Sequence, residues 1–300
     1  MARLGIGVAL PVMEFGSPRT SASWADLQEM IRLLESMGVD TIWVQDEIMW
    51  FPEGAEPQGA WDGVSILGAV AAISSTANVG SWVFSALHRN PAIIANAVET
   101  LDEISGGRFV FGLGAGHVWP GQAHATGLPE EAIYARFDEA LRIIIPLLRR
   151  GHADFEGQYH AARDLPQRPR GPRPGTIPIL IGGNGPKGQR AAVAHADIWS
   201  GWIEERAGMD EMLPRLASLE KILEEAGRDP SSIGRALGVP VNPLEPAGVD
   251  PATISGEPER IADDLRVFQA AGFTQVDIMI APGSVAAVAA LEPVVELLRG

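Results

Sequence analysis

The stretch LGIGVAL (residues 4–10), followed by SASWADLQEMIRLLESMG (21–38) and TIWVQ (41–45), shows the pattern that runs through the whole chain. The first and third pieces are short, apolar and contain β-branched residues, which is typical of buried strands. The middle piece has apolar residues at helical spacing, namely Leu27, Met30, Ile31 and Leu34. The sequence therefore predicts a strand, a helix and a second strand.

The same alternation recurs eight times. The predicted strands cover residues 4–10, 41–45, 78–84, 109–112, 178–181, 197–202, 236–241 and 275–280. The helices that follow them cover residues 21–38, 62–76, 91–104, 134–150, 189–195, 209–227, 258–272 and 285–298. Strands that alternate with helices require a parallel sheet, and eight such units predict a closed (β/α)8 TIM barrel. The alternative is an open, doubly wound sheet, but no Gly-rich turn follows the first strand.

One segment interrupts this alternation. Residues 151–177 include a Pro/Arg/Gly-rich stretch at 166–174, and we interpret the segment as a small hairpin with an irregular connection. We expect residues 1–300 to form a single barrel domain that carries this insertion.

Composition and charge exclude several classes of protein. The chain has 300 residues, no cysteine, and 23 Lys+Arg against 38 Asp+Glu, which gives a net charge of −15. An acidic surface repels phosphate backbones, so nucleic-acid binding is not expected. Without cysteine there are no disulfides, thiolate metal sites or cysteine nucleophiles. No apolar run approaches the ~20 residues of a membrane span, and no signal peptide is recognised, so we expect a cytoplasmic protein.

Function in a TIM barrel lies at the carboxyl ends of the strands. Four clusters fall there, at residues 45–51, 82–85, 112–117 and 182–187. In the last cluster, successive glycines expose backbone N–H groups just before a helix, with Lys187 near the start of that helix. Such groups and the helix dipole attract an anion, so the cluster predicts a phosphate site. A plain Gly-rich turn is the alternative.

The other clusters hold candidates for chemistry. Asp46 and Glu47 are adjacent carboxylates after the second strand, and either could meet a ligand or cap a helix. His117 could be an acid–base group, because the ordinary pKa of histidine is ~6.5. Trp50 could stack on a flat aromatic cofactor. The chain has no Walker loop, dinucleotide fingerprint or His-Glu-x-x-His motif, and we predict no metal site.

Several longer motifs follow one another in a consistent order. They are Arg89-Asn-Pro-Ala92, Leu101-Asp-Glu-Ile-Ser-Gly-Gly-Arg-Phe109, Gly112-Leu-Gly-Ala-Gly116, Pro178-Ile-Leu-Ile-Gly-Gly183 and Ala196-Asp-Ile-Trp199. In these motifs, which cover nearly the whole chain, the sequence resembles the luciferase-like monooxygenase superfamily. The resemblance is to the branch that contains the oxidoreductases dependent on coenzyme F420, a deazaflavin.

The resemblance implies a barrel that transfers a hydride between F420 and a small organic substrate, with FMN as the alternative cofactor. The cofactor ring is expected to rest on a bulge after strand three, often with a non-proline cis peptide, which maps to Trp82-Val83. The tail is expected along residues 182–187. The implied cofactor-binding residues are Asp46, Trp82, Val83, Ser85, Gly114, Ala115, Gly116, Ile181, Gly182, Gly183, Asn184, Gly185 and Lys187. A homodimer is also expected.

Two residues depart from the family pattern. Many deazaflavin-dependent members have Asp-His where this chain has Asp46-Glu47, and some have glutamate where it has His117. Our hypothesis is that Glu47 and His117 keep the acid–base work with exchanged identities, with Trp50 as a third catalytic candidate. Alternatively, the motif histidine is lost and the substrate class differs. An FMN-dependent monooxygenase that uses reduced flavin and oxygen, or a non-catalytic flavin-binding protein, are further alternatives. The sequence does not predict the substrate.

Overall fold

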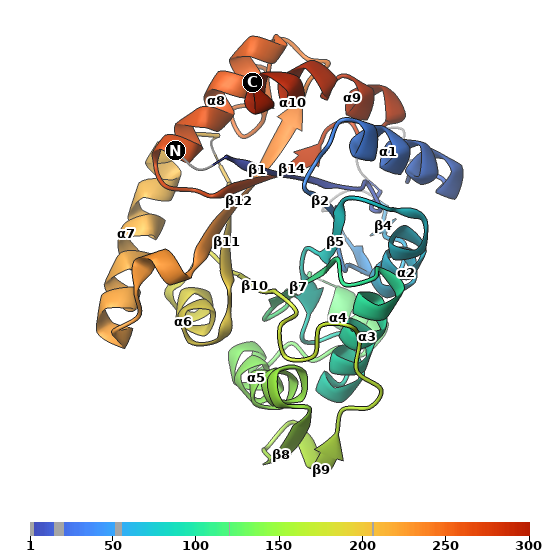
Figure 1. Cartoon of the computed structure of the whole chain (residues 1–300), viewed down its shortest axis with the longest axis vertical. Helices are drawn as coiled ribbons and strands as arrows, with labels where there is room; N and C mark the ends of the chain where they lie inside the picture. Colours follow the sequence, from blue (N-terminus) through green and yellow to red (C-terminus); the bar gives the residue numbers. More distant parts are fainter. Residues whose placement is uncertain (1–2, 15–20, 52–55, 120, 206) are drawn as a thin grey trace.

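Eight parallel strands close into a barrel at the centre of the molecule (Figure 1). The computed structural model describes residues 3–14, 21–51, 56–119, 121–205 and 207–300. The barrel strands are β1 (Gly5–Ala9), β2 (Thr41–Val44), β5 (Asn78–Ser81), β7 (Phe109–Gly114), β10 (Ile179–Gly182), β11 (Ile198–Trp202), β12 (Gly234–Asn242) and β14 (Gln275–Ile280). Each of these strands pairs in parallel with two neighbours. The ring is closed because β1 pairs with both β2 and β14, and β10 pairs with both β7 and β11. The predicted TIM barrel is confirmed, and the open sheet is wrong.

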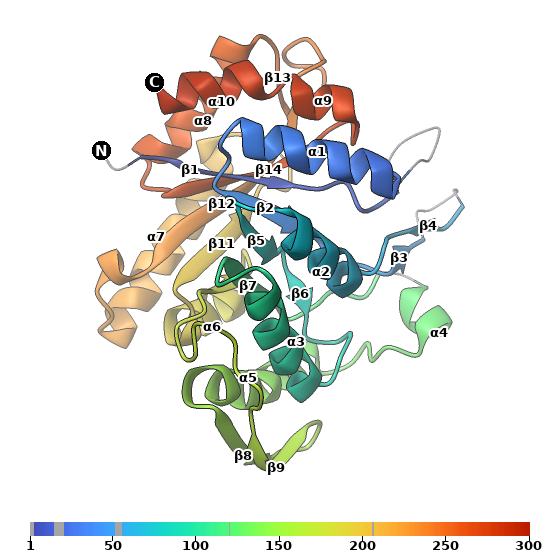
Figure 2. The same ribbon diagram turned by 45° about the vertical axis from the view of Figure 1, so that its right-hand side comes forward.

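Helices surround this barrel (Figure 2). They are α1 (Trp24–Ser36), α2 (Gly63–Ile73), α3 (Pro91–Ile104), α5 (Ile133–Arg150), α6 (Pro186–His195), α7 (Met209–Ala226), α8 (Pro258–Ala270), α9 (Val285–Ala289) and α10 (Glu292–Arg299). The helix predicted over 285–298 is in fact two helices, because Pro293, which has no N–H to donate, lies in the first turn of α10, just after its first residue. Within the described ranges, no helix is long and apolar enough to cross a bilayer.

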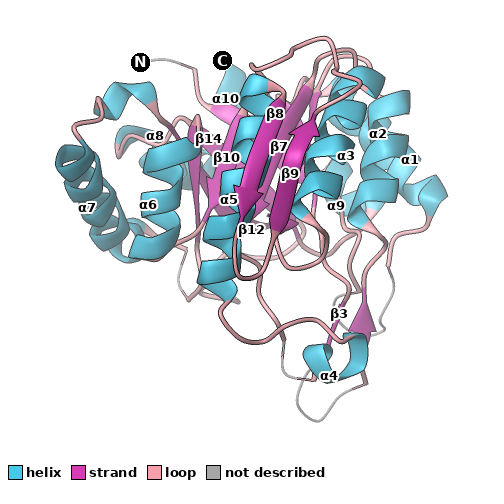
Figure 3. Ribbon diagram, turned by 90° about the horizontal axis from the view of Figure 1, so that it is seen from below, coloured by secondary structure: helices cyan, strands magenta, loops and turns pink. Residues whose placement is uncertain are grey.

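Short elements extend the carboxyl end of the barrel. The loop after β2 contains two paired strands, β3 (Met49–Trp50) and β4 (Gln58–Gly59), and the loop after β7 contains α4 (Gln122–Thr126). Figure 3 shows β3 and α4 side by side, projecting beyond the body of the barrel. Residues 52–55 and 120 of these loops lie outside the described residues. These loops therefore stand over the end of the barrel where function is expected.

The insertion after α5 forms the expected hairpin. Its strands are β8 (His152–Glu156) and β9 (Ala161–Pro166), which pair antiparallel. The carboxylate of Glu139 on α5 accepts backbone N–H bonds from all three residues 158–160, at 2.8, 2.8 and 2.9 Å. Two other small elements are the 3₁₀ helix η1 (Pro230–Ser232) and β13 (Ile254–Ser255).

A large indole fills the inside of the barrel. Trp43 on β2 is fully buried, and a Cβ at Gly80 would lie 2.1 Å from its ring. The Trp43 Nε1–H donates to Oδ1 of Asp277 at 2.6 Å, and Gln275 donates to the same oxygen at 2.6 Å. Burial raises the pKa of Asp277 to about 7 against these two hydrogen bonds. The barrel below the mouth is thus a packed core that contains one buried acid.

Candidate active site

The third barrel strand is broken where the resemblance predicts a bulge. After β5 the peptide bond between Trp82 and Val83 is cis, and pairing with β7 resumes in the short strand β6 (Phe84–Ser85). Just before the break, the hydroxyl of Ser81 ties the end of β5 to β7, since it donates to the Gly112 carbonyl at 2.8 Å and accepts from the Gly112 N–H at 2.9 Å. The expected non-proline cis peptide at 82–83 is confirmed.

The break sends two neighbouring side chains to different places. Trp82 turns into the barrel, where its ring packs edge-on against Trp202 at 5.4 Å and comes close to Gly238. Val83 stands at the mouth between two glycines: a Cβ at Gly114 would lie 2.9 Å from the Val83 side chain, and one at Gly182 would lie 3.4 Å from it. The glycines therefore leave the space that Val83 needs.

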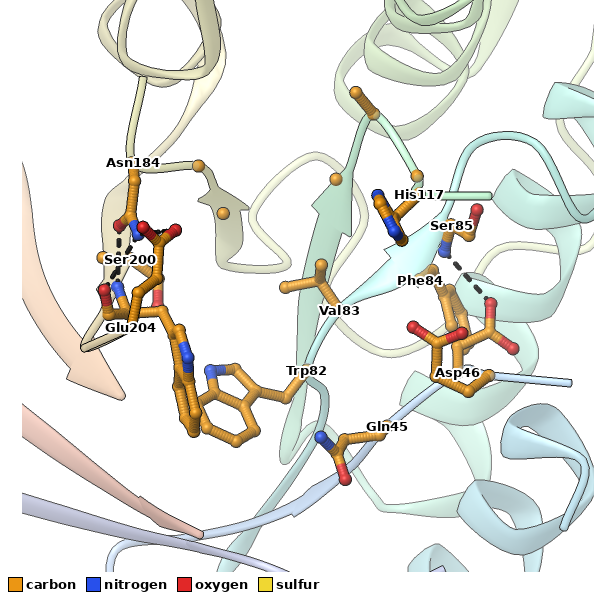
Figure 4. Close-up of a pocket in the computed structure, with 18 of the residues that line it drawn as sticks. Gln45, Asp46, Trp82, Val83, Phe84, Ser85, His117, Asn184, Ser200 and Glu204 are labelled. Carbon is orange, nitrogen blue, oxygen red and sulfur yellow. Dashed lines mark hydrogen bonds between the residues drawn. The ribbon is translucent and has the colours of Figure 1, made fainter. Parts of the chain in front are cut away.

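A pocket of about 400 Å³ opens over this bulge (Figure 4). The close-up places Trp82 and Val83 between two groups of polar side chains, one with Asn184, Ser200 and Glu204 and the other with Asp46, Ser85 and His117. The volume falls within the ~300–1,000 Å³ typical of sites for small molecules and cofactors.

Most of the predicted site residues line this pocket. Those that do are Asp46, Glu47, Trp82, Val83, Ser85, Gly114, Ala115, Gly116, His117, Gly182, Gly183 and Asn184. Trp50, Ile181, Gly185 and Lys187 are not among the lining residues: Trp50 lies in β3, Ile181 is fully buried in β10, and Gly185 precedes α6. Lys187 on α6 lies over the ring of Tyr134, at 4.7 Å. The binding and catalytic roles of all these residues stay predictions.

Asp46 anchors the mouth from below. Its buried carboxylate accepts two bonds from Arg89 Nη1, at 2.7 and 2.8 Å, and one from the Ser85 N–H at 3.1 Å. Nδ1 of His88 lies 3.5 Å away. Burial would raise the pKa of Asp46, but His88 and Arg89 outweigh that effect and hold the pKa below its ordinary value. Asp46 is therefore an ionised tether that fixes β6 to the end of β2.

Glu47 is a different kind of carboxyl. It lines the pocket, and its Oε2 is buried with no hydrogen-bonding partner among the described residues. Burial raises the pKa of Glu47, an effect only partly offset by the charge of His88 and a hydrogen bond with Trp119. A carboxyl of this kind holds its proton at higher pH than usual and can donate or accept it at the pocket surface.

His117 completes this side of the site. It follows Gly116 after β7, and its ring meets Trp119 edge-on at 4.6 Å. Trp119 in turn lies 6.2 Å from Trp50 of β3. The histidine and the carboxyl of Glu47 thus share one neighbour, the indole of Trp119.

The opposite side is held by a network that links the turn after β10 to β11. Oδ1 of Asn184 accepts from the Trp202 N–H at 2.8 Å, and its Nδ2 donates to the Trp202 carbonyl and to Glu204, each at 2.8 Å. Arg215 of α7 donates to the other oxygen of Glu204, also at 2.8 Å. Asn184 therefore shapes the Gly-rich turn, while its amide group is already used within the protein.

Sequence reasoning missed several residues of this site. The lining residues it assigned no role are Gln45, Phe84, Tyr134, Ser200, Gly201, Trp202 and Glu204, and His88 and Arg89 stand behind Asp46. Arg89 was visible only as part of a family motif. A partner for Asp46 at a distance of 43 residues leaves no local pattern from which to find it.

A comparison of the sequence with protein families gives one decisive match. The sequence model described as "Luciferase-like monooxygenase" matches residues 4–245. The chain belongs to the luciferase-like monooxygenase family.

Several curated relatives of this luciferase-like chain carry the name of an F420-dependent enzyme. It is 32% identical over 214 residues to a protein of Kineococcus radiotolerans named F420-dependent glucose-6-phosphate dehydrogenase, a match that covers 68% of this chain and 60% of the relative. It is 31% identical over 165 residues to 5,10-methylenetetrahydromethanopterin reductase of Archaeoglobus fulgidus, covering 54% of this chain and 44% of the relative. The matches thus span about half the length of these relatives.

Solved structures share the luciferase-like fold. An F420-dependent secondary alcohol dehydrogenase, solved with an F420–acetone adduct, has a TM-score of 0.81 at 18% identity and covers 99% of this chain and 100% of that chain. The F420-dependent tetrahydromethanopterin reductase of Methanopyrus kandleri has a TM-score of 0.77 at 20% identity, covering 97% and 98%. At these identities the likeness concerns the fold alone.

Proposed function

We propose that this protein is an oxidoreductase that transfers a hydride between coenzyme F420 and a small organic substrate at the carboxyl-end mouth of its barrel. The observation that carries the proposal is the carboxyl of Glu47 in the pocket beside the Val83 bulge, whose Oε2 is buried and has no hydrogen-bonding partner among the described residues. The name that several curated relatives share, F420-dependent glucose-6-phosphate dehydrogenase, supports F420 as the cofactor.

The residues present fit such a cofactor. Val83, with the open backbone of Gly114 and Gly182 beside it, offers an apolar platform for a flat ring. Next to it, Gly183 and Gly185 lead into α6, whose first N–H groups have no side-chain cap. Lys187 and Arg190 lie in the first turns of this helix. These features would hold the ring and the anionic tail, respectively.

When bound, F420 would supply hydride-transfer chemistry, taking a hydride from a substrate carbon or giving one to it. Oxidation of an alcohol to a carbonyl releases a proton from the substrate oxygen in addition to that hydride. In our proposal Glu47 accepts this proton, and it returns a proton to the carbonyl oxygen in the reverse direction. Burial raises the pKa of Glu47 above its ordinary value, so this carboxyl exchanges a proton at higher pH than an exposed glutamate does.

His117 has a second role in this proposal. It lines the same pocket, and both it and Glu47 contact Trp119. It would hydrogen-bond the substrate oxygen and so orient it toward Glu47. The exchange of glutamate and histidine relative to the family pattern would then leave one acid–base group and one orienting group in place.

Single-turnover hydride transfer in Glu47→Gln and His117→Ala tests these roles. We expect Glu47→Gln to lower the rate by about 10²–10⁴-fold, because the amide cannot exchange a proton. His117→Ala should lower it less. Glu29→Gln on the exposed surface of α1 is the control. F420 affinity, measured by fluorescence, should not change in Glu47→Gln. Full rates in both pocket variants would contradict the assigned roles.

A homodimer and a cytoplasmic location stay predictions from the resemblance and the composition. Light scattering of the purified chain measures the first.

A further inference from the structure

The charge of the pocket restricts which substrates it can take. Three carboxylates line it, those of Asp46, Glu47 and Glu204, and none of its lining residues in the described part of the chain is lysine or arginine. Asp46 is held ionised. An anionic substrate group would therefore enter a site that already carries negative charge.

The two arginines next to the pocket are both engaged by carboxylates. Arg89 donates to Asp46 and, from Nη2, to Asp62 at 3.0 Å. Arg215 contacts Glu204 at 2.8 Å and Glu211 at 2.9 Å. Each guanidinium thus faces two negative groups, so neither offers surplus positive charge to a phosphate.

Lys187 lies on the other side of the site. It is on α6 and contacts the Tyr134 ring, beside the Gly-rich turn assigned to the cofactor tail. The positive charge of the mouth is therefore on the side of α6. On the side of Glu47 and His117, the guanidinium of Arg89 is already paired with Asp46 and Asp62.

Aromatic surface stands beside Glu47 and His117 instead. The Trp119 side chain contacts both residues, keeps 36% of its surface exposed, and lies 6.2 Å from Trp50. An exposed indole at the rim of a pocket offers a face for an apolar group, and the one carboxyl and one imidazole beside it suit a single oxygen.

We propose that the substrate is an uncharged alcohol or carbonyl compound with an apolar body, which packs against Trp119 with its oxygen at Glu47 and His117, and that sugar phosphates are rejected. This inference rests on the proposed function. It differs from the substrate in the names of several relatives, which is glucose 6-phosphate.

Calorimetric titration of the F420-loaded protein tests it. The probes are cyclohexanone, glucose 6-phosphate and cyclohexylamine, which are neutral, anionic and cationic, respectively. We expect saturable binding of cyclohexanone, with an affinity at least about tenfold higher than for glucose 6-phosphate. Cyclohexylamine tests whether the carboxylates of the pocket favour a cation over a neutral compound. Turnover with cyclohexanol, followed by the loss of visible absorbance of oxidised F420, should show the same preference over glucose 6-phosphate.

Two substitutions separate the aromatic surface from the hydrogen bond. Trp119→Ala should weaken cyclohexanone binding about tenfold or more, whereas Trp119→Phe, which keeps an apolar ring, should retain most of it. The hydrogen bond from Trp119 lowers the pKa of Glu47, and Trp119→Phe removes this bond. The acid limb of the pH profile for cyclohexanol oxidation should therefore move to higher pH in this variant. Trp24→Ala on α1, with a comparable exposed fraction of 38%, is the control.

The outcomes separate the inference from the proposed function. If F420 fails to bind, the proposed function is wrong and the inference falls with it. If F420 binds but glucose 6-phosphate or cyclohexylamine is the better ligand, the substrate class is wrong while the function stands. Unchanged cyclohexanone affinity in Trp119→Ala would remove the proposed aromatic contact.

Discussion

Asp277 is an acidic residue in an environment that disfavours its charged form. It is fully buried inside the barrel, its Oδ1 accepts from Trp43 and Gln275, and its Oδ2 has no partner in the described structure. Burial raises its pKa from 3.8 to about 7. Between these two values the unfolded chain releases the proton while the folded chain keeps it. Asp277 therefore lowers the free energy of unfolding as pH rises through this window.

Asp277→Asn should remove this dependence. The amide oxygen can accept the same two N–H bonds and never ionises. The difference in free energy of unfolding, variant minus wild type, should increase by about 2–3 kcal/mol when the pH is raised from 5 to 8.5. Urea unfolding at both pH values measures this. A difference between variant and wild type that does not change with pH would show that Asp277 does not titrate in this window.

Asp46 and Glu47 show why sequence reasoning reached only part of the site. Their position after the second strand follows from the strand–helix alternation, and it placed both at the pocket. Their opposite pKa shifts do not follow from it, because they depend on Arg89, His88 and burial. Adjacent residues of one type thus acquire different chemistry from partners that are distant in the sequence.

Among the elements, β5 depends on the absence of a side chain at Gly80. This residue pairs with Trp43 of β2, and a Cβ there would lie 2.1 Å from the buried indole. Since backbone and a packed ring must then move apart, Gly80→Ala should cost about 1–3 kcal/mol or more in free energy of unfolding.

Gly68→Ala is the matched variant. Gly68 lies in α2 with open space where its Cβ would be, and alanine is the better helix former. It should stabilise the protein by about 0.5–1 kcal/mol. Thermal and chemical unfolding of the two variants measures this difference. If Gly80→Ala proved as stable as Gly68→Ala, the packing described for Trp43 would be contradicted.

The regular elements were predicted well because their signals are local. The strand predicted over 275–280 and the helix predicted over 91–104 match β14 and α3 in both bounds. The strand predicted over 78–84 is interrupted at Trp82-Val83, and α6 starts three residues before its predicted start at Gln189. These differences arise at the barrel mouth, where packing around Val83 and the Gly-rich turn outweighs local preference.

For the molecule as a whole, barrel closure brings distant loops to one mouth. Gly114, at the end of β7, faces Val83 after β5 and lies near the Gly182 carbonyl at the end of β10. The prediction of a closed barrel was therefore enough to gather most of the predicted site residues around one pocket. The side chains of Trp82 and Asn184 could not be oriented in advance, because each is turned by contacts with Trp202.

We propose that F420 lies on the Val83 bulge at this mouth. Equilibrium fluorescence titration of F420 and FMN against wild type, Gly114→Ala and Gly68→Ala tests it most directly. We expect wild type to bind F420 more tightly than FMN, and Gly114→Ala to weaken F420 binding about tenfold, because the added Cβ would lie 2.9 Å from Val83 and displace it. Gly68→Ala should bind as wild type does. Tighter binding of FMN than of F420 would contradict F420 as the cofactor, and unchanged F420 affinity in a folded Gly114→Ala variant would contradict its placement on the Val83 bulge.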